Sequence, residues 1–365
     1  MITGLRPLIR PWTTLVPVLA VVLLVFTWGR DLPGVVVGLV TVVLAGSVLA
    51  AVHHAEVVAH RVGEPFGSLV LAIAVTVIEV ALIVTLMADG GDKSSTLARD
   101  TVFAAVMITC NGIVGLCLLV ASLRHGTAVF NPEGTGAALA TVATLATLSL
   151  VLPTFTTSKP GPEFSPVQLT FAALSSLILY GLFVATQTVR HRDYFLPITR
   201  QGEVIADTHA QPPSARTARF SLGLLGLALI GVVGLAKGVS PTIESGVEAA
   251  GLPQAVVGVI IALLVLLPET IAALRSARRD RVQTSLNLAL GSAMASIGLT
   301  IPAVALASVW LSGPLVLGLG STHMLLLALT VVVSSLTVVP GRATPLQGGV
   351  HLVVFAAYLE LAINP

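Results

Sequence analysis

Charged side chains are scarce in this sequence. Only 10% of its 365 residues are Asp, Glu, Lys or Arg, whereas 55% are hydrophobic; an ordinary soluble domain carries about 25% charged residues. So few charges cannot cover a soluble surface of this size, which excludes cytosolic enzymes and secreted domains. A net charge of +2 without a dense basic stretch also excludes nucleic-acid binding.

Cysteines and catalytic motifs are equally sparse. The two cysteines, Cys110 and Cys117, share one apolar run; seven helical residues span about 10.5 Å, too far for a disulfide. We interpret both as small core residues. The sequence contains no H-E-x-x-H motif and no recognisable nucleophile constellation, so we expect neither enzymatic activity nor a cofactor.

Apolar runs of about 20 residues, the length that a helix needs to cross a bilayer, recur along the chain. We predict an all-α integral membrane protein with about eleven transmembrane helices. The predicted spans are residues 12–28, 33–55, 65–88, 100–123, 136–155, 165–188, 218–238, 253–275, 283–310, 321–339 and 347–363. No A-x-A cleavage pattern follows the first span, so we interpret it as a retained helix and not as a signal peptide.

One stretch is convincingly hydrophilic, residues 190–217, and we interpret it as a linker. It follows a leading helix in residues 1–32 and a first group of five spans in residues 33–189; a second group of five occupies residues 218–365. An odd number of spans gives the two groups opposite orientations. Inverted repeats of this kind are typical of transporters.

The basic residues predict the orientation in the membrane. If the linker is cytoplasmic, most of the 19 Lys and Arg residues fall on the cytoplasmic side, as the positive-inside rule expects. The N-terminus is then cytoplasmic and the C-terminus lies outside.

Two glutamates, Glu79 and Glu269, lie deep inside the third and eighth predicted spans. A charge at the centre of a membrane helix costs about 2.5 to 3.5 kcal/mol. A proton or a bound cation can neutralise such a carboxylate, and the two exclude each other. That competition is the minimum chemistry of a cation:proton antiporter, and a carboxylate pair favours Ca²⁺. The alternative is a protonated glutamate that only joins helices.

Neighbouring polar groups are candidate cation ligands. Thr76 lies one turn before Glu79, and Pro268 frees a helix carbonyl directly before Glu269. A hydroxyl bonded to its own helix and a simple packing kink are the respective structural alternatives.

The span that follows each glutamate adds further candidates. We predict Asn111 and Ser292 as ligands, with Asn287 one turn earlier in the second case. The structural alternative is that small and polar residues join neighbouring helices.

A polar stretch follows the second predicted span. His54, Glu56, His60 and Glu64 can bind and release protons. We predict either a proton relay or pH sensor on the cytoplasmic side, or simply a polar loop at the membrane interface.

At these residues the chain resembles the bacterial ChaA-type calcium (sodium, potassium):proton antiporters of the calcium/cation:proton exchanger superfamily. The resemblance extends over nearly the whole chain and is strongest in residues 54–79, 282–302 and 341–359. It implies a leading helix followed by two inverted five-helix repeats. It also implies a cation held between Glu79 and Glu269, and cation export from the bacterial cell across the inner membrane, driven by inward proton flow.

The sequence departs from the superfamily at the Gly-Asn-x-x-Glu pattern, which is replaced in residues 75–79 and 265–269. Fewer side-chain oxygens extend the expected cations to Na⁺ and K⁺. Two alternatives use the same carboxylates: a passive cation channel, and a sodium/calcium-type exchanger without proton coupling. The expected partners are cations, protons and the lipid bilayer.

Overall fold

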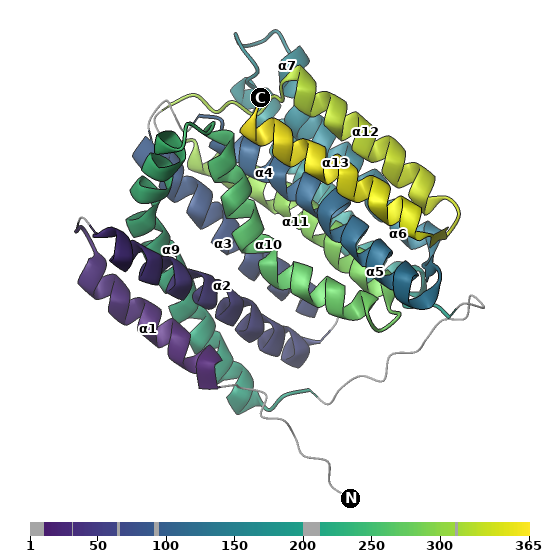
Figure 1. The fold of residues 1–365 in the computed structure, drawn as a ribbon, viewed down its shortest axis with the longest axis horizontal. Coiled ribbons are helices and arrows are strands. Elements are labelled where there is room, and N and C mark those ends of the chain that lie inside the picture. The colour runs from purple at the N-terminus through teal and green to yellow at the C-terminus, as the bar shows by residue number, and fades with distance from the viewer. Residues whose placement is uncertain (1–10, 31, 64–65, 91–94, 200–211, 311–312) are drawn as a thin grey trace, which may run out of the picture. The chain divides into compact units, whose positions relative to one another are not determined.

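The computed structural model describes residues 11–365 except 31, 64–65, 91–94, 200–211 and 311–312, and it is almost entirely helical (Figure 1). The α-helices are α1 Pro11–Thr27, α2 Gly34–Val62, α3 Phe66–Gly90, α4 Leu97–Met107, α5 Val114–His125, α6 Pro132–Ala146, α7 Leu152–Phe155, α8 Pro166–Ala185, α9 Ala215–Ala249, α10 Ala255–Ala277, α11 Val282–Ala307, α12 Ser321–Val338 and α13 Pro345–Ile363. The π-helical segments are η2 Ile108–Ile113, η3 Thr147–Val151 and η4 Thr186–Arg190; η5 Arg192–Phe195 is a 3₁₀-helix.

Each predicted apolar run coincides with one continuous helical stretch, which confirms the all-α membrane fold class. By length and composition, nine stretches in the described part of the chain can cross a membrane. Two further apolar helices, Pro11–Thr27 and Ala72–Thr85, are shorter. The count of eleven spans therefore stays a prediction. Two of the predicted spans end well before their helices do: α2 continues past residue 55 to Val62, and α9 continues past residue 238 to Ala249.

Several helices begin with the same short pattern, an N-cap residue followed by proline. Asn131 accepts hydrogen bonds from the backbone N–H groups of the first turn of α6. Ser165 and Thr344 form capping boxes with glutamines three residues later, at the starts of α8 and α13. Proline has no N–H to leave unsatisfied at this position, so the pattern defines where each helix starts.

The chain forms two compact units. Unit 1 comprises Met1–Leu86 and His209–Gly246, and unit 2 comprises Met87–Thr208 and Val247–Pro365. Each unit thus combines residues from before and after the linker. The predicted division into sequence repeats is a different kind of boundary and stays a prediction.

In unit 1, α1 lies against α2 and α9 through small residues (Figure 1). A Cβ atom on Gly46 of α2 would lie 3.1 Å from a methyl group of Val16, and one on Gly231 of α9 would lie 2.8 Å from Cβ of Ala20. Glycine at these positions lets the helix backbones approach closely, which is how helices associate in a bilayer.

A proline in α1 creates a further contact with α2. Pro17 has no N–H for the Thr13 carbonyl, which a regular helix would supply. His54 of α2, which is fully buried, reaches this carbonyl with Nε2 at 2.9 Å. Because a carbonyl only accepts, Nε2 donates, so His54 joins α2 to the first turn of α1.

In unit 2, α11 contacts α6, α8 and α10, while α10 packs on α4 and α13 packs on α5. The antiparallel strands β1 (Ala128–Val129) and β2 (Arg342–Ala343) join the loops before α6 and α13. These contacts surround a core of large buried side chains: Phe103, Met107, Leu118, Met294 and Ile297.

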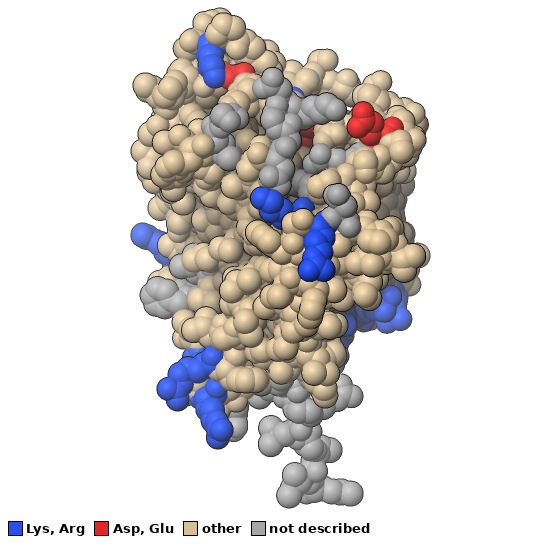
Figure 2. Space-filling view, turned by 90° about the vertical axis from the view of Figure 1, so that its left-hand side faces the viewer, with Lys and Arg blue, Asp and Glu red and all other residues tan. Residues whose placement is uncertain are grey.

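The surface of the molecule suits lipid. Figure 2 shows a face that is mostly free of charge, with Lys and Arg in separate small groups. Large apolar side chains are exposed along several helices, among them Leu15, Val25, Leu39, Phe171, Ile178, Leu325 and Val353. A water-facing surface would rarely expose so many, whereas hydrocarbon is compatible with all of them.

Candidate functional site

Glu79 is a buried carboxylate in unit 1. It lies on α3 with only 4% of its surface exposed, and Thr76, one turn earlier, is 6% exposed. The apolar sequence around them favours a membrane helix, so the carboxylate is removed from bulk water.

Glu269 lies on α10 in unit 2 and is half-buried, with its Oε2 atom shielded from solvent. Pro268, directly before it, does not interrupt α10, which runs from Ala255 to Ala277. Glu79 and Glu269 belong to different units, and their pairing around one cation stays a prediction.

Asn111 lies in the π-helical segment η2, midway along the helical stretch from Leu97 to His125, and is fully buried. Its Nδ2 donates to Oγ1 of Thr330 on α12 at 2.9 Å. Its Oδ1 lies 3.2 Å from Nδ1 of His351 on α13. Wide π-turns interrupt helices preferentially at functional positions, and this one carries a predicted ligand.

Ser292 and Asn287 both lie on α11, and both are half-buried. Asn287 accepts from Gln283 at 2.9 Å and donates to the backbone carbonyl of Phe195 at 2.6 Å. Gln283 in turn accepts from the backbone N–H of Asn131 at 2.7 Å. Asn287 therefore holds the segment after α8 against α11.

The histidine-rich stretch that begins at His53 is helical as far as Val62, which corrects the alternative of a polar loop at these residues. His54, Glu56 and His60 lie on the last turns of α2. His54 is buried, Glu56 is half-buried and His60 is exposed. The three side chains therefore differ in their exposure to solvent, and His54 is hydrogen-bonded to α1. Glu64 lies outside the described residues.

A polar network around His351 was not predicted from the sequence. Nε2 of His351 lies 3.2 Å from Oγ1 of Thr337, and the side chain is 1% exposed. A single histidine within a predicted membrane span, residues 347–363, was the signal that could have indicated it.

A second unpredicted cluster lies at the start of α4. Asp100, only 6% exposed, accepts from Oγ1 of Thr96 and from Nε of Arg99, both at 2.8 Å. The ring of Phe103 lies 4.9 Å from that of His323 on α12, between ring centroids. A carboxylate in the first turn also complements the helix dipole, so this cluster stabilises the start of α4.

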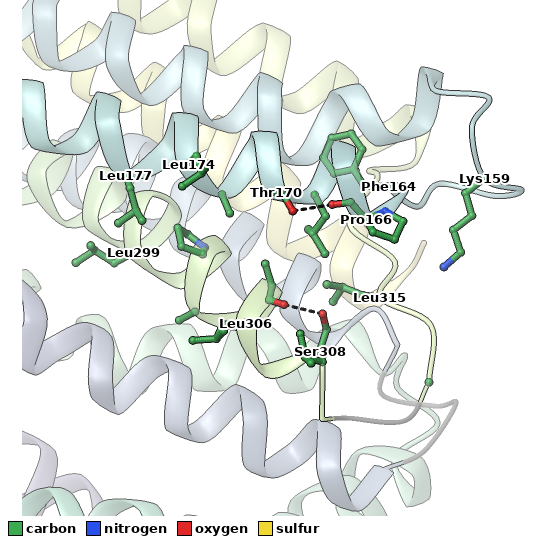
Figure 3. A pocket seen from close by; sticks show the side chains of 17 residues that line it. Lys159, Phe164, Pro166, Thr170, Leu174, Leu177, Leu299, Leu306, Ser308 and Leu315 are labelled. Carbon is green, nitrogen blue, oxygen red and sulfur yellow. Dashed lines mark hydrogen bonds between the residues drawn. The ribbon is translucent and has the colours of Figure 1, made fainter.

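A cavity of about 840 Å³ lies between α8, the second half of α11 and the loop after it (Figure 3). Of the described residues that line it, Lys159 alone is charged, and it forms an ion pair with Glu163. The hydroxyls of Thr170 and Ser308 each donate to a backbone carbonyl three or four residues earlier, at 2.8 Å. The cavity therefore offers a cation no acidic ligand.

Metal-binding side chains are not concentrated anywhere in the described residues: no group of three or more His, Cys, Asp or Glu is placed to hold a metal ion.

The fold is that of solved exchangers. The structure of native YfkE matches with a TM-score of 0.71 at 16% identity, covering 97% of this chain and 99% of that chain. The crystal structure of the H⁺/Ca²⁺ exchanger CAX matches with a TM-score of 0.70 at 16% identity, covering 95% and 86%. These neighbours share the helical, multi-pass fold of this chain.

A family model described as sodium/calcium exchanger protein matches residues 32–189 and 220–364. The y4hA protein of Sinorhizobium fredii is 47% identical over 357 residues, covering 97% of this chain and 96% of the relative. The sodium-potassium/proton antiporter ChaA of Escherichia coli is 36% identical over 348 residues, covering 94% and 93%. The chain belongs to the sodium/calcium exchanger protein family, within the calcium/cation:proton exchanger superfamily.

Proposed function

We propose that this protein is a secondary-active cation:proton antiporter that exports Ca²⁺ in exchange for protons, with Na⁺ and K⁺ as further substrates. The observation that carries the proposal is a carboxylate with 4% exposure, Glu79, on an apolar helix, together with Glu269 on a second one. One sequence relative and one structural neighbour support the choice of ions: ChaA is named a sodium-potassium/proton antiporter, and CAX an H⁺/Ca²⁺ exchanger.

The proposed coupling follows from electrostatics. A carboxylate that has lost its water needs a positive partner, and either a proton or a cation supplies it. If Glu79 and Glu269 share one site, cation binding expels protons and proton binding expels the cation. With neither cation nor protons bound, the site carries two negative charges that no bound ion neutralises. In this state the protein is least able to switch the access of the site from one side of the membrane to the other.

The proposed cation ligands are the two glutamates with Thr76, Asn111 and Ser292. Ca²⁺ seeks six to eight oxygens, and a carboxylate can bind it through one oxygen or two. Two carboxylates and three uncharged groups reach that number only if the carboxylates bind through both oxygens or if water or backbone carbonyls add to them. Such a site also suits a monovalent cation with one proton retained. Pro268 and Asn287 are proposed to shape the helices around the site, and His54, Glu56, His60 and Glu64 to lie on the proton route.

We further propose a leading helix in residues 1–32 and two inverted repeats in residues 33–189 and 218–365. The two matches of the family model, at residues 32–189 and 220–364, support this division. The excess of basic residues supports a cytoplasmic linker at residues 190–217 and a cytoplasmic N-terminus. The proposed location is the bacterial inner membrane.

The test is transport in proteoliposomes, with Ca²⁺, Na⁺ and K⁺ supplied singly across an imposed pH gradient. We expect cation uptake coupled to proton movement, and its abolition in Glu79→Gln and in Glu269→Gln. Glu133→Gln is the matched control, because Glu133 is exposed in the first turn of α6.

Full exchange in both glutamine variants would refute the proposal. A reversal potential that does not change with the pH gradient would indicate a passive channel instead. Calcium transport driven by Na⁺ alone would indicate an exchanger without proton coupling.

A further inference from the structure

We propose that His351 is a positioning residue of the cation site: it holds the carboxamide oxygen of Asn111 in the orientation that serves the cation. The inference rests on the proposed function, because it assumes that Asn111 is a ligand. His351 itself acts through Asn111 and does not touch the ion.

The orientation of the Asn111 amide is determined by Thr330. The Thr330 hydroxyl donates to the backbone carbonyl of Leu326 at 2.8 Å, so its oxygen accepts from Nδ2 of Asn111 at 2.9 Å. The carboxamide oxygen then faces Nδ1 of His351 at 3.2 Å. Because that oxygen only accepts, Nδ1 of His351 carries the hydrogen.

The imidazole is held from several sides. Its Nε2 then has no hydrogen, lies 3.2 Å from Oγ1 of Thr337 on α12 and accepts from that hydroxyl, whose other partner is the backbone carbonyl of Val333 at 2.9 Å. On α5, a Cβ atom at Gly115 would lie 2.9 Å from Cβ of His351, so glycine is needed for the helices to approach here. A cavity of about 20 Å³ borders the ring, which is room for about one water molecule. The ring therefore has little freedom to turn.

The π-helical segment gives this network access to the proposed site. Residues 108–113 form the wide turn that carries Asn111. Helix α10, which carries Glu269, packs against the same segment. A change in how His351 holds Asn111 thus occurs beside the glutamate-bearing helix of unit 2.

Burying an imidazole and an amide in an apolar bundle requires a physical reason. Both groups lose water, and the hydrogen bond between them recovers only a small part of that loss. Apolar side chains of similar volume would join η2 and α13 at least as well. What the polar pair adds is a defined direction for the Asn111 oxygen, which a ligand needs and a packing contact does not.

Two substitutions distinguish the contributions of the two ring nitrogens of His351. In His351→Asn, the amide nitrogen takes the place of Nδ1 and can still donate to Asn111. In His351→Gln, the amide nitrogen takes the place of Nε2 and reaches Thr337 instead. The measurement is the initial rate of Ca²⁺/H⁺ exchange in proteoliposomes as a function of Ca²⁺ concentration, with thermal unfolding in detergent measured in parallel.

We expect His351→Asn to keep the KM for Ca²⁺ within about 2-fold, and His351→Gln to raise it about 10-fold at a maximal rate changed less than about 2-fold. Ser334→Ala is the control, because Ser334 lines the same small cavity as His351; its KM should not change. Asn111→Ala should raise the KM at least as much as His351→Gln.

Equal KM values in the Asn and Gln variants, or a loss of thermal stability with an unchanged KM, would show that His351 only supports packing and would overturn the inference. An unchanged KM in Asn111→Ala would also overturn it, because there would be no ligand to position. In that case an inactive Glu79→Gln would still support the proposed function, so the two failures are distinguishable.

Discussion

In each family-matched segment, a helical stretch with buried polar residues follows the glutamate-bearing helix. The contacts that these polar residues make differ between the two segments. In the first family-matched segment, the stretch from Leu97 to His125 contains a π-turn, and its buried Asn111 bonds to α12 and α13. In the second segment, α11 is a regular α-helix, and Gln283 and Asn287 in its first turns bond to the start of α6 and to Phe195.

This difference separates two uses of polar groups in a membrane protein. At the end of a helix, amide side chains satisfy loop backbone groups that would otherwise be left without partners. In the middle of a helix, they need partners from other helices, and a π-turn changes the direction in which they point. Asn111 is therefore held between helices, where we propose it as a ligand, whereas Gln283 and Asn287 hold loops against α11.

The largest effect should come from shortening the two glutamates. Glu79→Asp and Glu269→Asp keep the charge but withdraw each carboxylate by one methylene. If both segments contribute one carboxylate to one site, we expect kcat/KM for Ca²⁺ to fall about 10² -fold in each variant, since a misplacement of about 1 Å costs that much. Proteoliposome transport measures it, and a loss confined to one variant would contradict the equivalence of the two segments.

A smaller, structural effect is expected from Gln283→Leu. This substitution removes the bonds to Asn131, Thr135 and Asn287 and leaves their buried partners unsatisfied, at about 1 to 3 kcal/mol. We expect a lower unfolding temperature in detergent, with the KM for Ca²⁺ unchanged in the folded fraction. A raised KM at normal stability would contradict the distinction between the two segments, because the polar residues at the start of α11 would then contribute to cation binding.

A double substitution tests the contact between α1 and α2. His54→Leu should leave the Thr13 carbonyl without its side-chain donor and lower stability by about 1 to 2 kcal/mol. Pro17→Ala restores a helical N–H to this carbonyl and should recover part of that loss when combined with His54→Leu. Thermal unfolding of the unchanged protein, the two single variants and the double variant gives the coupling free energy between the two positions. Strictly additive effects would show that Pro17 and His54 act independently.

The smallest effect is expected from Lys159→Ala. Lys159 is 46% exposed and pairs with Glu163 at the rim of the apolar cavity; exposed ion pairs contribute about 0 to 1 kcal/mol. Transport and unfolding temperature should both stay within experimental error. A clear loss of transport would show that the cavity beside α11 takes part in the cation route.

Much of the fold could be predicted because lipid imposes a simple rule. Runs such as 12–28 and 218–238 had to be helical, since only helices satisfy their own backbone groups within one apolar segment. The end of α2 was misplaced because its last turns carry His54, Glu56 and His60, and polar residues there resemble a loop. Only the contact with α1 explains why the helix continues.

The candidate site was predicted unevenly. Glu79 stands out in the sequence because a lone carboxylate is costly in an apolar run, and its burial agrees with that expectation. His351 was overlooked because its partners, Asn111 and Thr337, come from two other helical segments. Sequence spacing carries no information about bonds between residues that are 240 positions apart.

The sequence by itself determined that the protein lies in lipid, where its helices run and which two carboxylates, Glu79 and Glu269, lie within apolar runs. These features could be predicted because the scarcity of charge and the length of apolar runs are local properties of the chain. The tertiary structure decided what each polar residue does. It directed His54 to a carbonyl that Pro17 leaves without its helical donor, Asn287 to Phe195 and Asn111 to His351. Inside an apolar bundle a polar group must find its partner wherever packing brings one within hydrogen-bond distance, and only the folded chain specifies that place.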